Sequence, residues 1–95
     1  MAANTAPALL ILTGPIAPQD IPALCRRART LLDQSDAELV VCDVRALDRP
    51  DVVAVEALAR VRLTVRRLGR RVRFCHPCRE LGELLAFMGL ADILD

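Results

Sequence analysis

The chain is poor in the side chains that most enzymes use for proton transfer and nucleophilic attack. Its 95 residues contain one His, no Trp and no Tyr, and Lys is absent while Ser occurs once. No glycine-rich phosphate loop is present, because the four Gly are scattered along the sequence. General bases and nucleophiles are therefore scarce, and we expect neither enzymatic activity nor a bound cofactor.

Aromatic residues and long apolar runs are also rare. Two Phe are the only aromatics in a chain that is 54% hydrophobic, so the core must be built from Leu, Val, Ile and Ala. No segment approaches the roughly 18 consecutive apolar residues of a membrane span, and Met1–Asn4 lacks the basic start of a signal peptide. We therefore expect a cytoplasmic protein whose four Cys are reduced thiols.

The positive and negative charges of the chain nearly cancel, but the basic residues are all of one type. All 13 basic residues are Arg, and the formal net charge is +1. A field of that size favours neither nucleic acid nor an anionic membrane. The Arg bias, together with many Ala, Leu, Val and Pro, is typical of a GC-rich genome, and the alternative is a phosphate-binding face made of Arg.

The hydrophobic pattern alternates between strand and helix periods along the chain. The predicted elements are a strand at 8–12, a helix from 18 that ends at 34–36, a strand at 38–44, a helix at 51–68, a strand at 71–75, and a helix that begins at 78 or 79 and ends at 89. Ile93 and Leu94 either add a closing strand or pack as a tail. The connections are too long for hairpins, which favours a mainly parallel sheet with crossover helices.

Four short motifs occur in the same order as in a known family. They are the turn Gly14-Pro15-Ile16, the pair Asp43-Val44 followed by Asp51, the helix positions Leu58 and Gly69, and the closing Met88-Gly89-Leu90. With these motifs in register, the chain resembles the STAS domain, the fold of anti-sigma factor antagonists. The resemblance implies one α/β domain over 1–95, with a core at about 8–94 and a small, mainly parallel or mixed sheet covered by three to four helices.

The chain departs from this family at the residue that carries its regulation. In family members that are switched by phosphorylation, the second Ser of an Asp-Ser-Ser-Gly motif accepts a phosphate from an anti-sigma kinase. The matching residues here are Asp51-Val52-Val53-Ala54, and the valine at position 53 has no hydroxyl group. The aspartate of the family's first turn is likewise replaced by Ala17. We therefore predict that the phosphorylation switch is absent.

The helix that follows Asp51 has two apolar sides. One stripe predicts the core face: Ala54, Leu58, Val61, Val65 and Leu68. Val52, Ala59 and Leu63 point in the opposite direction, inside a rim of charged residues. Such a strip is either an ordinary surface with single apolar residues or a face that a protein partner covers. The predicted partner-binding residues are Asp48, Asp51, Val52, Val53, Glu56, Ala59, Arg60 and Leu63.

The resemblance suggests several partners for this face. The first is an anti-sigma factor related to serine kinases, which the unphosphorylated family state binds; with Val53 fixed, binding would be constitutive and controlled by abundance. Loss of the switch would equally suit a family member with an unrelated partner. Another reading is the STAS accessory subunit of a lipid-transporting ABC system. The strip could also close a homodimer. Asp51 itself either contacts a partner's cation or stabilises the helix N-terminus.

A pair of cysteines supports an alternative to a protein-binding function. Cys75-His76-Pro77-Cys78 lies between a strand and a helix, where a helix N-terminus lowers the pKa of a thiol. A redox protein using Cys75 and Cys78 is therefore an alternative, although the motif follows the third strand instead of opening the domain. A zinc site is disfavoured, because adjacent Cys75 and His76 form a poor chelate. We predict that Cys75 simply ends a strand and that Cys78 lies at the helix N-cap.

Overall fold

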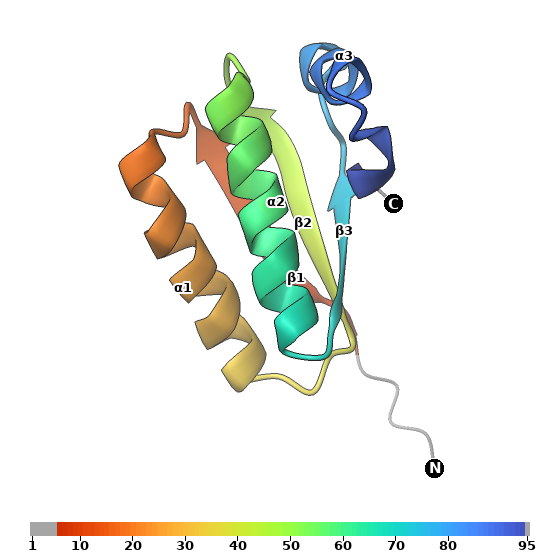
Figure 1. Cartoon of the computed structure of the whole chain (residues 1–95). Helices are drawn as coiled ribbons and strands as arrows, with labels where there is room; N and C mark the ends of the chain where they lie inside the picture. Colours follow the sequence, from red (N-terminus) through yellow and green to blue (C-terminus); the bar gives the residue numbers. More distant parts are fainter. Residues whose placement is uncertain (1–5, 95) are drawn as a thin grey trace.

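The protein alternates strands and helices throughout the part of the chain that the structure describes. The computed structural model describes residues 6–94 (Figure 1). The elements are β1 (Ala8–Gly14), a 3-10 turn η1 (Pro18–Asp20), α1 (Ile21–Asp33), β2 (Leu39–Leu47), α2 (Val52–Arg67), β3 (Arg71–Cys75), α3 (Arg79–Phe87) and a 3-10 turn η2 (Ala91–Leu94). This order confirms the predicted α/β alternation.

The three strands form one parallel sheet with β2 in the centre. The strand order is β1-β2-β3, and both pairings are parallel. Parallel neighbours need a crossover connection, which α1 supplies between β1 and β2 and α2 supplies between β2 and β3. All three strands end at the same edge, so the β2–α2 loop and the turn after β1 lie at that edge (Figure 1).

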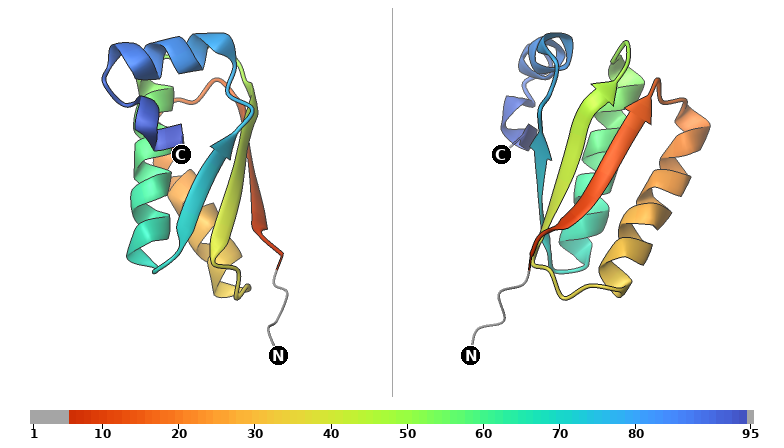
Figure 2. Two further views of the ribbon diagram at one scale, coloured as in Figure 1. Left: turned by 90° about the vertical axis from the view of Figure 1, so that its right-hand side faces the viewer. Right: turned by 180° about the vertical axis from the view of Figure 1, so that it is seen from behind.

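The helices cover only one face of the sheet. Figure 2 shows α1 and α2 on one side of the strands, with α3 lying across the end of the sheet. Strand side chains alternate accordingly: Leu10, Leu12 and Val40 are buried against the helices. On the other face Leu9 and Ile11 are 56% and 46% exposed. The core is aliphatic as predicted, with Phe74 as its one aromatic residue in the described part of the chain.

The two ends of α2 are fixed by specific residues. The Asp51 carboxylate accepts a hydrogen bond from the Ala54 N–H at 3.1 Å, which makes Asp51 the N-cap. At the other end Gly69 has a φ of +77°, a backbone conformation that is energetically unfavourable for a residue with a Cβ atom. The N–H of Gly69 donates to Arg66 O and that of Arg70 to Val65 O, which is the Schellman motif. Gly69 therefore ends the helix, as predicted.

The second strand is longer than predicted, and this moves Asp43 away from the loop. Residues 45–47, predicted as loop, continue β2, because Ala46 and Leu47 pair with Thr13 and Gly14 after an irregularity at which β2 holds one residue more than β1. Asp43 thus lies inside β2 and not at its end. Only Asp48 and Asp51 contribute acidic side chains to the β2–α2 loop.

One smaller prediction about the helices was wrong. Leu68 was expected to face the core, but it is 38% exposed, because it is the C-cap at which α2 turns away. Of the two alternatives for Ile93 and Leu94, the structure shows the packed tail, since both belong to η2 and Ile93 is buried. No helix within residues 6–94 has the length and apolar character needed to cross a membrane.

Candidate functional site

The N-terminus of α2 is tied to the turn after β1. Asp48 donates its N–H to the Gly14 carbonyl oxygen at 3.1 Å, so the two loops meet at the edge where the strands end. Gly14 allows this close turn through a φ of +68°. The next residue of the β2–α2 loop, Arg49, also has a positive φ, of +51°. The loop is therefore a tight connection that leads directly into the Asp51 N-cap.

The Asp51 carboxylate is engaged within its own helix. Its Oδ1 atom accepts from Ala54 N, while the side chain stays exposed to solvent. This is the structural role predicted for Asp51. A carboxylate has further lone pairs beyond the one used here, so the same group can still accept a hydrogen bond from a partner.

Val53, the predicted counterpart of the family's phosphoacceptor, lies in the first turn of α2. It is half-buried and packs against the hydrophobic core, whereas its neighbour Val52 is 60% exposed. The side chain thus contributes to packing at the first turn of α2. It offers no oxygen to a phosphoryl group, and the nearest preceding hydroxyl side chain in the sequence is that of Ser35, before β2.

The outward face of α2 carries the strip that the sequence predicts. Val52 and Leu63 are 60% and 45% exposed, and Ala59 lies exposed between them. Glu56 and Arg60 are exposed beside this strip. The structure therefore brings the predicted partner-binding residues onto one helix face and its preceding loop. Val53 is the exception, because it turns toward the core.

Helix α1 contributes to this face in a way that the sequence did not predict. A groove of about 610 Å³ runs between the two helices, and Leu63, Arg60 and Arg67 line its α2 side. Its α1 side includes Arg26 and Arg29. The sequence does indicate that Arg26 is exposed, since Arg26 lies off the core stripe of its helix. Periodicity alone, however, does not show which helices are neighbours. The groove extends the outward strip into a surface that combines apolar and cationic side chains.

The four cysteines are free thiols in different environments. Cys75 ends β3 and Cys78 is the N-cap of α3, both half-buried, where the sequence places them. Cys42 is fully buried in β2. Burial raises the pKa of the Cys42 thiol to about 12, and the charges of Asp43 and Cys75 add to the shift.

The remaining candidate ligands are dispersed. No group of three or more His, Cys, Asp or Glu side chains converges among residues 6–94 in a way that could hold a metal ion. The Asp43 carboxylate accepts from the Arg45 N–H at 2.9 Å. Its neighbours Cys42 and Val44 are buried, so Asp43 points to the uncovered face of the sheet. Asp43 and the α2 strip are thus on opposite faces of the molecule.

Comparison with known proteins assigns the chain to a family. A search of curated proteins gave no match. The solved structure of the anti-sigma factor antagonist SpoIIAA in its unphosphorylated form superposes with a TM-score of 0.67 at 14% sequence identity, covering 88% of this chain and 73% of that one. This similarity confirms the predicted fold. The STAS domain model matches residues 2–95, and the chain therefore belongs to the STAS domain family.

Proposed function

We propose that this chain is a protein-binding regulatory module of the anti-sigma factor antagonist type. Its binding surface is the outward face of α2 with the β2–α2 loop, made of Asp48, Asp51, Val52, Glu56, Ala59, Arg60 and Leu63; Val53, also predicted for this surface, packs against the core and supports it from within. The observation that carries the proposal is the exposed apolar strip of Val52, Ala59 and Leu63. Membership of the STAS family and the fold shared with SpoIIAA support it.

The chemistry of this surface suits association better than catalysis. Apolar side chains in the middle lose water when a partner covers them, and charged side chains at the rim set orientation and specificity. Leu63 is the largest apolar residue of the strip and borders the α1–α2 groove. It is therefore the residue whose change should weaken binding most.

Regulation of this surface does not use phosphorylation in our proposal. Valine at position 53 leaves the family's acceptor position without a hydroxyl group, and the side chain instead supports the first turn of α2. The surface is then permanently in the unmodified form. The amount of complex follows the abundance of the chain and its partner.

Affinity capture with variant baits tests the proposal. The wild-type chain and Leu63→Glu are used as baits in an extract of the native host, and the bound proteins are quantified by mass spectrometry. We expect the wild type to retain an anti-sigma factor of the serine-kinase type and Leu63→Glu to lose most of it. A charge placed in a desolvated apolar contact costs several-fold to many-fold in affinity.

Phe87→Glu is the matched control, because Phe87 is 88% exposed at the end of α3. This variant also replaces an exposed apolar residue with a carboxylate but leaves α2 intact, so it should retain the partner. Equal capture by Leu63→Glu and the wild type would reject the α2 surface. Capture of an ABC-transporter ATPase in place of an anti-sigma factor would reject the assigned class of partner.

A further inference from the structure

The outer edge of β3 has main-chain groups without a partner. In a parallel ladder, residues alternate between pointing their N–H and C=O toward the neighbouring strand and away from it. Arg71 donates its N–H to Glu38 O at 2.8 Å, on the β2 side, so Val72 points its N–H and C=O outward. No backbone bond outside the sheet engages Val72 within residues 6–94. Because η2 packs beside the later part of β3 (Figure 1), the part of this edge that η2 leaves uncovered is centred on Val72, which is 8% exposed with its side chain in the core and lines a hollow at the edge.

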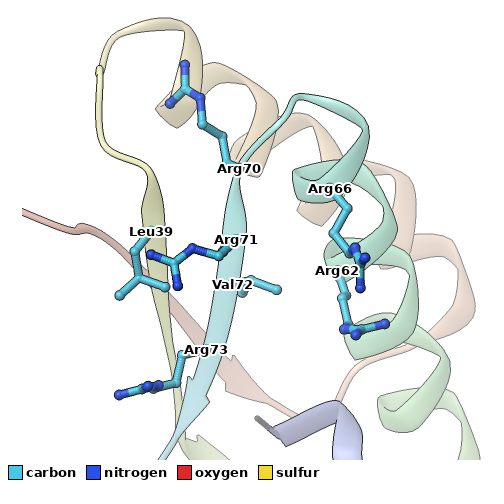
Figure 3. A pocket seen from close by; sticks show the side chains of 7 residues that line it. All are labelled: Leu39, Arg62, Arg66, Arg70, Arg71, Val72 and Arg73. Atoms are coloured by element: carbon cyan, nitrogen blue, oxygen red, sulfur yellow. The ribbon is translucent and has the colours of Figure 1, made fainter.

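Arginines lie on both sides of this open edge. Figure 3 shows Arg71 and Arg73 on the side of the uncovered sheet face, and Arg62 and Arg66 on the side of α2. The hollow between them has a volume of about 400 Å³. Its lining is completed by Leu39, Val72 and Arg70.

These guanidinium groups differ in how they are satisfied. Arg70 donates to the carbonyl oxygens of Ser35 and Ala37 at 3.0 and 2.7 Å and is held in place. The other four have no ion-pair partner in the described residues, where the single salt bridge joins Arg79 and Glu83. No acidic side chain lines the hollow. Several uncompensated cations that are held close together create a local field that attracts an anionic ligand.

We propose that the β3 edge binds an extended acidic segment of a protein. The segment adds a strand to the sheet by pairing with the main chain at Val72. Its side chains then alternate between the two faces of the sheet, and each face has two arginines within the hollow. Carboxylates at neighbouring positions of the segment therefore meet guanidinium groups on both sides.

The main chain favours an extended peptide over a small anion. A compact anion would use only one group of arginines and would leave the edge of the strand unpaired. Arginine on an edge strand also discourages pairing between two copies of the chain. This effect accounts only for Arg71 and Arg73, which belong to β3. It does not explain Arg62 and Arg66, which belong to a helix. This surface shares no residue with the α2 partner surface and does not depend on that proposal.

Fluorescence anisotropy with a labelled Glu-Glu-Val-Glu-Glu-Val-Glu-Glu peptide tests the inference on the full chain. We expect saturable binding that weakens with added salt. The double variants Arg71→Gln/Arg73→Gln and Arg62→Gln/Arg66→Gln should each bind at least about fivefold more weakly, because each removes two charge-assisted contacts. Within residues 6–94 these four side chains form no hydrogen bonds that support the fold, and unfolding curves would verify that each variant folds.

Three controls make the result specific. Arg26→Gln/Arg29→Gln removes the same charge from α1 and should bind like the wild type. A peptide with Pro in place of both Val keeps its charge but loses backbone donors, and it should bind more weakly. Binding that is lost only in the α1 variant, or that is unaffected by Pro, would overturn the proposal. So would an equally Arg-dependent binding of a single-stranded oligonucleotide with no binding of the peptide.

Discussion

Asp51 has a structural role that can be separated from any role in binding. Its carboxylate caps α2 by accepting from Ala54 N at 3.1 Å. The sequence predicts this role at the helix N-terminus, because an acidic residue before an amphipathic run is a helix start signal. It could not place Val53 against the core, since helical periodicity assigns a residue at the border of two faces to neither.

Asp51→Ala is expected to destabilise the fold by about 1 kcal/mol, which is the typical cost of removing an N-cap side chain. Asp51→Asn should recover most of this loss, because Asn caps as well as Asp. Urea unfolding of both variants measures the effect. Asp48→Ala is the control in the same loop, where the structure shows only a main-chain bond from Asp48. A loss in Asp51→Asn as large as in Asp51→Ala would show that the negative charge, and not the cap, stabilises the helix.

The buried thiol of Cys42 predicts how stability changes at alkaline pH. Its pKa is raised from 9.0 to about 12 in the folded protein, mainly by burial. Between these values the folded chain holds a proton that the unfolded chain has released, so stability must fall as pH rises from about 9 toward 12. The chain has no Lys or Tyr, whose titration usually obscures this range.

Urea unfolding of the wild type and Cys42→Ala across this pH range checks the effect. The variant should be less stable at neutral pH, because it leaves a small cavity, but its stability should fall less steeply with pH. Parallel pH profiles for the two proteins would show that Cys42 does not determine the alkaline dependence.

At the scale of elements, the sequence predicts the helix ends and the parallel sheet correctly, but it does not predict the length of β2. Gly69 is recognisable as a helix end because Gly is the usual residue after a C-cap. The extension of β2 through Leu47 depends on pairing with β1, some thirty residues earlier in the chain, across an irregularity between Asp43 and Ala46. Alternation within 45–47 is too short to reveal it. The same limitation hid the α1–α2 groove, which exists only because the two helices are neighbours.

Two glycines give opposite expectations for the same substitution. Gly69→Ala should destabilise the protein by about 1 kcal/mol, since a Cβ atom disfavours the left-handed conformation at φ of +77°. Gly82→Ala should stabilise it by about 0.5–1 kcal/mol, because Gly82 lies inside α3 with open space around its Cα. For a domain of this size, 1 kcal/mol corresponds to roughly 4–8 °C in Tm. Shifts of the same sign in thermal unfolding would contradict this account of helix termination.

The whole molecule presents two kinds of surface that sequence patterns could not separate. Helices α1 and α2 cover one face of the sheet and expose the strip of Val52, Ala59 and Leu63, whereas the other face of the sheet is bare (Figure 2). The amphipathic pattern of α2 predicted the first surface. Nothing local predicted that β3 would be an edge strand with arginines on both sides, because this follows from strand order and from the position of α2.

The most direct test of the central claim is an NMR titration of the isotope-labelled chain with the captured partner protein. We predict that the amide signals of the loop at Asp48 and of α2 at Glu56, Ala59 and Leu63 shift or broaden as partner is added. The signals of Leu9 and Ile11, on the bare face of the sheet, should stay in place. The opposite pattern, with the α2 signals unchanged while those of the sheet face move, would contradict the assignment of α2 as the partner surface.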